Sequence, residues 1–246
     1  MPSPGAVAAE ASIVIVMVAD TAAVEGVLLG ANGILSAARS RCLVIDMGTT
    51  AVAATRRFAK TVIDAGGDYV DAPVSGGTIG AEAASLTIMA GGSAAAVDRA
   101  RPVFEVLGSR VTHVGLTGTG QIAKAANQMI VGLSIGAVAE ALTLARRAGA
   151  DPAKVREALK GGFADSRILE VHGQRMISGE LKPGAKATTQ RKDMAQALAL
   201  ADEVGVDLPA TRLNLGLYEK LIALGFGDLD HAALIKAIDV APAKPK

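Results

Sequence analysis

The stretch HVGLTGTGQIAKAANQ, residues 113–128, marks a change of pattern in the chain. Before it, short apolar runs alternate with helical stretches, and after it only helical patterns follow. Gly118, Gly120 and Ala123 spell G-x-G-x-x-A, which is close to the glycine fingerprint of a dinucleotide-binding turn. The chemistry of this turn therefore bears on both the fold and the function.

The surroundings of the glycines argue against a phosphate-binding turn. Such a fingerprint belongs in a β-α-β unit, with an acidic residue about 20 positions further on, after a second strand. Here a helical pattern continues over residues 119–148, and Glu140 stands in the middle of it. The glycines instead open a helix on which Lys124, Asn127 and Gln128 share one face. A lysine beside two amides suits acid–base chemistry, although an ordinary surface lysine fits the spacing too.

Residues 1–117 have the pattern of an α/β domain. Strands alternating with helices predict a mostly parallel, doubly wound sheet. A helical stretch covers residues 51–65, and the run 12–18 is apolar on both faces, as expected for a central parallel strand. The β-type runs cover residues 12–18, 42–46, 69–74, 85–92 and 110–114.

Residues 118–246 have the pattern of an all-helical domain. The long helix is apolar nearly all round, which predicts burial on most of its sides, and Gly132 and Gly136 predict a close helix contact. Gly149 is placed to end this helix, and Asp151-Pro152 to open the next one. Further helical patterns cover residues 166–177, 191–204, 209–224 and 230–238.

The composition restricts the class of protein. The 25 basic and 24 acidic residues nearly balance, and two Tyr, four Phe and no Trp give no sign of a nucleic-acid binder. The lone Cys42 excludes an internal disulfide, and the three histidines lie too far apart in the sequence to suggest a metal site. Because we find neither a signal-like start nor an uninterrupted apolar span, we expect a cytoplasmic protein without a membrane partner.

A second motif, DAPVSGG at residues 71–77, ends a β-type run with Ser75, Gly76 and Gly77. Such a turn offers a hydroxyl and unhindered backbone N–H groups to an anion, although an ordinary strand-ending turn has the same composition. Ligands of open α/β sheets bind outside the carboxyl ends of strands. We therefore expect this turn and Lys124 to line one pocket.

These segments together resemble the β-hydroxyacid dehydrogenase family, which includes 3-hydroxyisobutyrate dehydrogenase and tartronate semialdehyde (2-hydroxy-3-oxopropionate) reductase. The resemblance implies a Rossmann-type domain at residues 1–117 that binds NAD or NADP. It also implies a helical domain at 118–246, of the 6-phosphogluconate dehydrogenase type, for substrate binding and dimerisation. The implied reaction moves a hydride between the nicotinamide and a small 3-hydroxyacid or semialdehyde. The matching text is DAPVSGGTIGAEAASLTIMAGG (71–92), GTGQIAKAANQMIVGLSIGAVAEALTLARRAGAD (118–151) and LKPGAKATTQRKDMAQAL (181–198).

The resemblance also implies roles for individual residues. Lys124 is the implied acid–base group, which protonates the nascent alkoxide in reduction and deprotonates the hydroxyl in oxidation. The substrate carboxylate is expected at Ser75, Gly76 and Gly77, and the amides of Asn127 and Gln128 are expected to orient substrate and lysine. The acidic Asp20 departs mildly from the residues that the family often has at this position. The implied cofactor contacts are Val18, Ala19, Asp20, Thr49 and Lys192.

The large departure from the family is at the start of the chain. The family begins with a strand, a G-x-G-x-x-G turn, a helix and a second strand that selects NAD or NADP, whereas this text begins just before the family's fourth strand. A sheet without its first strands leaves the run 12–18 as an apolar edge, so we expect a homodimer or a higher homo-oligomer.

Three accounts of this departure stay open: a shortened gene product, a chain completed by another subunit, or a non-catalytic carboxylate-binding or oligomerisation remnant. The intact Lys124, Ser75 and Lys192 favour a recent loss over long decay, and an enzyme is the leading hypothesis.

Overall fold

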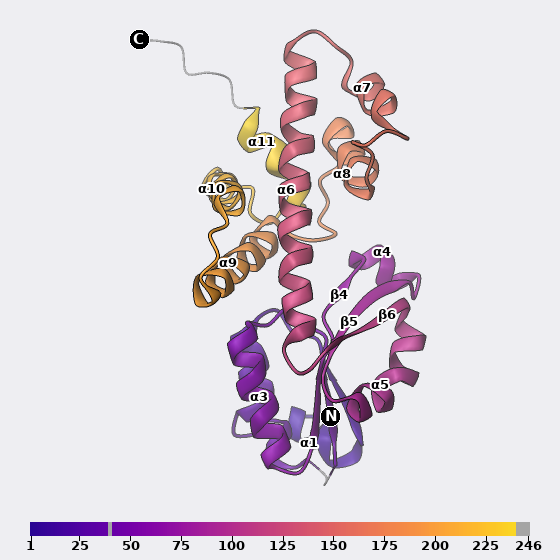
Figure 1. Ribbon diagram of the computed structural model, residues 1–246, viewed down its shortest axis with the longest axis vertical. Helices are drawn as coiled ribbons and strands as arrows, with labels where there is room; N and C mark the ends of the chain where they lie inside the picture. Colours follow the sequence, from indigo (N-terminus) through magenta and orange to yellow (C-terminus); the bar gives the residue numbers. More distant parts are fainter. Residues whose placement is uncertain (39–40, 240–246) are drawn as a thin grey trace. The chain divides into compact units, whose positions relative to one another are not determined.

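The computed structural model describes residues 1–38 and 41–239, which are drawn as ribbons in Figure 1. The chain divides into two compact units, Met1–Ala125 and Ala126–Lys246. This division lies inside helix α6 (Thr119–Arg147), whereas the change of sequence pattern lies where that helix begins.

In the described part of the first unit, the strands form a six-stranded sheet of order β1-β2-β3-β5-β4, with β6 also paired to β5. The neighbours β1, β2 and β3 are parallel, as are β5 and β6, but β5 runs antiparallel to β3 and β4. The described sheet is thus mostly parallel, as predicted, with antiparallel pairing of β5 to β3 and β4. The strands are β1 (Ile13–Val16), β2 (Leu43–Asp46), β3 (Asp68–Asp71), β4 (Val74–Ser75), β5 (Leu86–Gly91) and β6 (Gly108–Gly115).

The predicted run 69–74 is two strands, β3 and β4, separated by Ala72 and Pro73. Proline has no N–H to donate to a ladder, so the pairing breaks there. The run 12–18 is not a central strand, because β1 stands at the end of the strand order and Ile15 is 44% exposed. In the described sheet, strands β2 and β3 are the ones buried on both faces. Val44 and Tyr69 pack in one core cluster, while Leu43, Ile45 and Val70 pack in another.

Helices α3 and α5 cover opposite faces of this sheet (Figure 1). Phe58 of α3 lies in the cluster that contains Val44, and Phe104 of α5 lies in the cluster that contains Ile45. The helical elements of this unit are α1 (Pro4–Glu10), α2 (Thr21–Leu29), the 3-10 turn η1 (Ile34–Ser36), α3 (Val52–Asp64), α4 (Gly77–Glu82) and α5 (Ala94–Leu107).

The helices are the regular elements of the second unit in its described residues. Gly149 ends α6 with a φ of +88°, and Asp151 caps the next helix by accepting the N–H of Ala153, as predicted. The predicted helix at 230–238 is a 3-10 turn followed by a short α-helix. After α6 the elements are α7 (Pro152–Leu159), α8 (Arg167–Ser178), α9 (Ala187–Val204), α10 (Pro209–Ala223), η2 (His231–Leu234) and α11 (Ile235–Ile238).

Helix α6 is only partly covered by its neighbours. A Cβ added at Gly132 would lie 2.6 Å from Met194 Sδ, and one at Gly136 would lie 2.3 Å from Asn214 Nδ2, so the predicted close contact is confirmed. The predicted burial on most sides is wrong, because only 33% of the most apolar window of α6 is buried. By length and composition α6 could cross a membrane, a property that it shares with the core helices of many proteins.

Candidate functional site

A buried carboxylate accepts the free backbone N–H groups at the start of α6. Asp71, at the end of β3, is completely buried and accepts the backbone N–H of Gly118 at 2.7 Å and that of Gln121 at 3.0 Å. Burial raises the pKa of Asp71 to about 6, although these two N–H groups act to lower it. The carboxylate thus uses the helix N-terminal donors that a phosphate would need, in agreement with the argument from the sequence.

The glycines of this turn allow a close approach of backbones. Gly118 has a φ of +91°, which favours glycine. A Cβ added at Gly120 would lie 2.4 Å from the carbonyl oxygen of Met89 and 2.7 Å from that of Asp71. Gly120 is therefore required to bring the start of α6 against β3 and β5, and the G-x-G-x-x-A text reflects packing.

Lys124 lies in the second turn of α6 and is 7% exposed. Its Nζ donates a hydrogen bond of 2.7 Å to the carbonyl oxygen of Val74 in β4. Because Ser75 follows Val74, the fold brings the lysine to the DAPVSGG segment, although 50 residues separate the two bonded groups in the sequence.

The turn after β4 depends on its two glycines. Gly76 has a φ of +137° and Gly77 has a φ of +61°, and both values favour glycine. A Cβ added at Gly76 would lie 3.2 Å from Leu86 Cδ2 and 3.3 Å from Gly80 Cα. The backbone of this turn is thus held against α4 and β5, next to Ser75 and the lysine-bearing end of β4.

The segments that carry the expected cofactor contacts of the first unit follow two neighbouring strands, β1 and β2. The ends of β1 and β2 are paired at Val16 and Asp46, so residues 17–20 and 47–50 leave the same edge of the sheet. A Cβ added at Gly48 would lie 3.1 Å from the carbonyl oxygen of Val18. Open α/β sheets bind nucleotides at this edge, and the expected NAD(P) contacts Val18, Ala19 and Thr49 lie there.

Asp20 has a structural role at the same edge. It is the N-cap of α2, where its carboxylate accepts the backbone N–H of Ala23 at 2.9 Å. This cap explains why an aspartate stands at position 20, where members of the family often have another residue.

Two residues that the sequence analysis did not single out organise the loop after β2. Buried Asp46 accepts the N–H of Gly48 at 3.0 Å and the hydroxyl of Thr50 at 2.8 Å. Gln121 accepts the N–H of Thr50 and donates to the carbonyl oxygen of Gly48 at 2.9 Å. The sequence signal for Gln121 is a long polar side chain in the first turn of a largely apolar helix.

In the second unit, the predicted residues of α6 and α9 belong to one network. Gln128 Nε2 donates to Asp193 Oδ2 at 2.6 Å and to Gln190 Oε1 at 3.3 Å, and Gln128 Oε1 accepts from Asn127 Nδ2 at 2.8 Å. Lys192 Nζ lies 3.2 Å from Asp193 Oδ1. Asn127, Gln128 and Lys192 thus meet through buried Asp193 and Gln190, neither of which the sequence analysis singled out.

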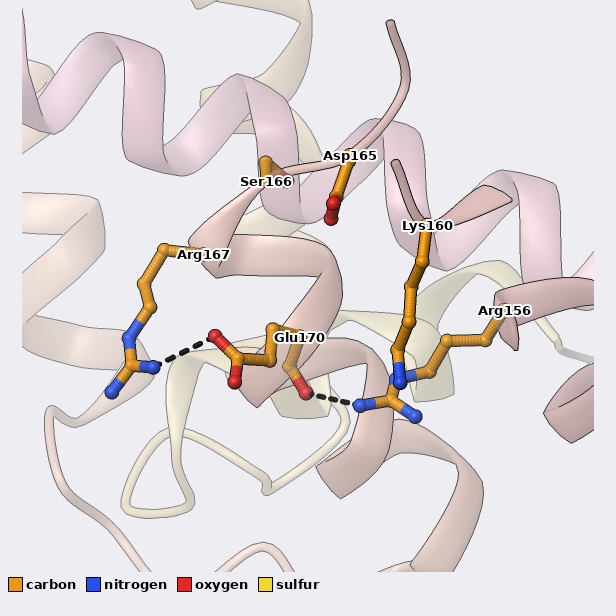
Figure 2. A pocket seen from close by; sticks show the side chains of 6 residues that line it. All are labelled: Arg156, Lys160, Asp165, Ser166, Arg167 and Glu170. Carbon is orange, nitrogen blue, oxygen red and sulfur yellow. Dashed lines mark hydrogen bonds and ion pairs between the residues drawn. The ribbon is translucent and has the colours of Figure 1, made fainter. Parts of the chain in front are cut away.

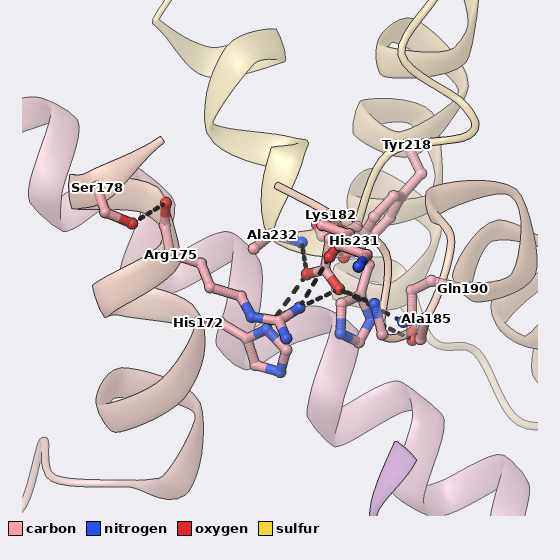
Figure 3. Close-up of polar contacts among 11 residues, drawn as sticks. His172, Arg175, Ser178, Lys182, Ala185, Gln190, Tyr218, His231 and Ala232 are labelled. Carbon is pink, nitrogen blue, oxygen red and sulfur yellow. Dashed lines mark hydrogen bonds and ion pairs between the residues drawn. The ribbon is translucent and has the colours of Figure 1, made fainter. Parts of the chain in front are cut away.

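A second polar cluster surrounds Asp230, which pairs with His172 and Arg175. Figure 3 shows the side chains of His172, Arg175 and His231 close to one another. The sequence separates these histidines, but the fold sets their rings 4.5 Å apart, and with Asp230 they offer three possible metal ligands within 4.8 Å. Burial opposes ionisation of Asp230, yet His172, His231 and backbone N–H groups hold its pKa well below its usual range. Arg175 and the N–H of Gly184 both donate to the same oxygen of Asp230, so the cluster connects α8 and the segment around Gly184 to the start of η2 and does not have the open oxygen that a metal site would need.

The pocket in Figure 2, of about 550 Å³, contains none of the predicted site residues. Its charges are largely satisfied: Lys160 pairs with Glu157, Arg167 pairs with Glu170, and Arg156 donates to two backbone carbonyls. We therefore do not assign chemistry to it. Its lining residues are Arg156, Lys160, Asp165, Ser166, Arg167 and Glu170.

Comparison with known proteins gives matches over both units. Residues 1–115 match the family model of the NAD binding domain of 6-phosphogluconate dehydrogenase, and residues 118–238 match that of NADP-dependent 3-hydroxyisobutyrate dehydrogenase. The chain is 48% identical to 2-hydroxy-3-oxopropionate reductase of Escherichia coli, over 93% of this chain and 78% of that protein. It is 37% identical to 2-(hydroxymethyl)glutarate dehydrogenase of Eubacterium barkeri, over 94% of this chain and 77% of that protein.

A solved structure agrees with these matches. The structure of 3-hydroxyisobutyrate dehydrogenase from Mycobacterium tuberculosis with L-serine superposes with a TM-score of 0.88 at 30% identity, covering 98% of this chain and 84% of that one.

Proposed function

The chain belongs to the β-hydroxyacid dehydrogenase family of NAD(P)-dependent oxidoreductases, and we propose that it reduces 2-hydroxy-3-oxopropionate to glycerate. The observation that carries this choice of substrate is the 48% identity to a reductase of that name, compared with 37% to the glutarate-type dehydrogenase. The similarity extends over both units, which favours an enzyme over the non-catalytic remnant considered above.

In this proposal Lys124 is the general acid. NAD(P)H, when bound, supplies the hydride that adds to the aldehyde carbon. Lys124 donates a proton from Nζ to the aldehyde oxygen, so that the carbonyl becomes a primary alcohol, and the reverse reaction returns the proton to the lysine. The carbonyl oxygen of Val74, 2.7 Å from Nζ, fixes the position of the ammonium group.

The other predicted residues bind and orient. Ser75 and the N–H groups of the Gly76-Gly77 turn take the substrate carboxylate, and Asn127 and Gln128 take its hydroxyl groups. Support comes from the glycine conformations at the turn and from the shared network of the two amides. Val18, Ala19, Asp20, Thr49 and Lys192 are the proposed contacts of NAD or NADP.

The test is the rate of NADH and NADPH oxidation with 2-hydroxy-3-oxopropionate for the wild type, Lys124→Ala and, as a matched control, Lys60→Ala. We expect Lys124→Ala to lower kcat by about 10²–10⁴-fold, because a positioned proton donor is lost. Lys60 is an exposed lysine paired with Asp64, and its removal should leave the rate unchanged. A Lys124→Ala variant with more than a tenth of wild-type turnover would exclude the acid–base role.

The choice of substrate is tested separately. We expect kcat/KM for the reduction of 2-hydroxy-3-oxopropionate to exceed that for the semialdehydes of 3-hydroxyisobutyrate and 2-(hydroxymethyl)glutarate at least tenfold with the same reduced cofactor. A preference for either of the other acids would place the chain in another branch of the family while leaving its membership intact.

A further inference from the structure

We propose that Asp193 is a positioning residue that sets the direction in which the amides of Gln128 and Asn127 point. The consequence for turnover rests on the proposed function, whereas the direction of the amides is a property of the chain alone.

A buried carboxylate fixes which end of a neighbouring amide faces it. Asp193 is 3% exposed, and its Oδ2 lies 2.6 Å from Gln128 Nε2. An ionised carboxylate can only accept hydrogen bonds, so the amide of Gln128 must turn its NH₂ group toward it. The reversed amide would place two acceptor oxygens in contact and leave a buried group without a partner.

The orientation of the Gln128 amide in turn determines the orientation of the Asn127 amide. With its NH₂ group turned to Asp193, Gln128 offers Oε1 on the other side of the amide, where it accepts from Asn127 Nδ2 at 2.8 Å. Asn127 therefore turns its NH₂ group toward Gln128 and its carbonyl oxygen away from it. A carbonyl oxygen in this position accepts a hydrogen bond from a substrate hydroxyl.

Gln190 supports the same direction independently. It is 1% exposed, and its Nε2 donates to the backbone carbonyl oxygen of Gln128 at 2.8 Å. Because that carbonyl can only accept, Gln190 must turn its Oε1 the other way, where it meets Gln128 Nε2 at 3.3 Å. Two acceptor-only groups, the carboxylate and the backbone carbonyl, thus require the same orientation of the Gln128 amide.

Asp193 also faces the lysine proposed to bind the cofactor. Its Oδ1 lies 3.2 Å from Lys192 Nζ in an ion pair, but within the described part of the chain this oxygen has no partner with hydrogen-bond geometry. One buried carboxylate therefore contacts both a residue assigned to substrate and a residue assigned to cofactor.

The first experiment measures the amides directly in the unliganded chain. In protein labelled with ¹⁵N at Asn and Gln side chains, we expect the side-chain NH₂ protons of Asn127 and Gln128 to exchange at least tenfold more slowly than those of exposed Gln174. Asp193→Asn should bring both to within threefold of Gln174, because the introduced amide can donate as well as accept. Slow exchange of Asn127 that survives this substitution would overturn the proposal.

Two further variants make the measurement specific. Asp202→Asn, the same change at an exposed carboxylate of α9, should leave exchange and activity unchanged. If Asp193→Asn does not fold, Gln128→Leu interrupts the network between Asp193 and Asn127, and the Asn127 NH₂ protons must exchange faster. An unchanged Asn127 in that variant would equally contradict the proposal.

The second experiment is a compensating pair. In Gln128→Glu with Asp193→Asn, the introduced carboxylate accepts from the introduced amide and from Asn127, so the direction of Asn127 is kept. We expect Asp193→Asn to lower kcat/KM for 2-hydroxy-3-oxopropionate at least tenfold and the pair to return it to within fivefold of the wild type. A pair no more active than Asp193→Asn alone would contradict the proposed positioning role.

The two proposals fail in different ways. A wild-type chain that does not reduce 2-hydroxy-3-oxopropionate removes the proposed substrate, while amide exchange still decides the role of Asp193. A chain that reduces it but keeps slow Asn127 exchange in Asp193→Asn retains its proposed function and excludes the positioning role.

Discussion

Asp71 is a single residue that links the sheet to the start of the lysine-bearing helix. Its two oxygens accept the N–H groups of Gly118 and Gln121, so the position of Lys124 depends on a carboxylate buried at the end of β3. Burial raises its pKa to about 6, which means that the folded protein holds the proton more tightly than the unfolded chain does.

This raised pKa predicts a pH-dependent stability. The unfolded value is about 4, so the stabilisation is fully present below that pH and is lost as the pH rises through 6. Compared with Asp71→Asn, which cannot ionise, the wild type should lose up to about 3 kcal/mol of unfolding free energy between pH 4 and 7. Urea unfolding at several pH values measures this difference, with exposed Asp64→Asn as control. A wild-type-minus-variant difference that does not change with pH would refute the prediction.

The element whose placement matters most is α6, because its first turns carry Lys124 and follow Gly120. The glycine has almost no room for a side chain, whereas Gly216 in α10 has no neighbouring atom within 4 Å of an added Cβ. Identical substitutions at the two glycines therefore separate close packing from the general preference of helices for alanine.

We expect Gly120→Ala to lower the free energy of unfolding by about 1–3 kcal/mol, since backbone carbonyls must move away from the added methyl group. Gly216→Ala should raise it by about 0.5–1 kcal/mol, because glycine destabilises a helix interior. Thermal and urea unfolding of both variants measure the difference. Equal effects at the two positions would show that the start of α6 is not tightly packed.

At the scale of the whole molecule, apolar surface is left uncovered in the described residues. Ile130 and Leu144 of α6 are 65% and 72% exposed, and Met17 after the end strand β1 is 64% exposed. Long helices with exposed apolar side chains commonly pack against another subunit. We therefore propose that the chain forms a homo-oligomer.

Light scattering at micromolar concentration should give a species of at least twice the chain mass of 24.8 kDa. Leu144→Lys should shift the distribution toward the monomer, because a charge is costly to bury in a subunit contact. Asp98→Lys, at an exposed polar position of α5, is the control and should have little effect. A wild type that stays monomeric at these concentrations would exclude the proposed oligomer.

The sequence by itself determined the alternation of strands and helices before residue 118, the helical pattern after it and several of the element ends. Gly149, Asp151 and Ser166 mark helix boundaries because their conformations and caps are local, and hydrophobic periodicity needs only neighbouring residues. The two motifs and the lysine were recognisable for the same reason, and the family resemblance that they carried agrees with the matches over both units.

The tertiary structure alone decided the direction of β5, the half-covered state of α6 and the partners of the buried polar groups. Asp71 and Gly118 are 47 residues apart, and Gln128 and Asp193 are 65 residues apart. No local pattern encodes a hydrogen bond over such a distance, because an acid in a strand or helix has the same sequence signature whether it faces water or a buried N–H group. Folding selects the partner, since a buried charge or amide without one is costly.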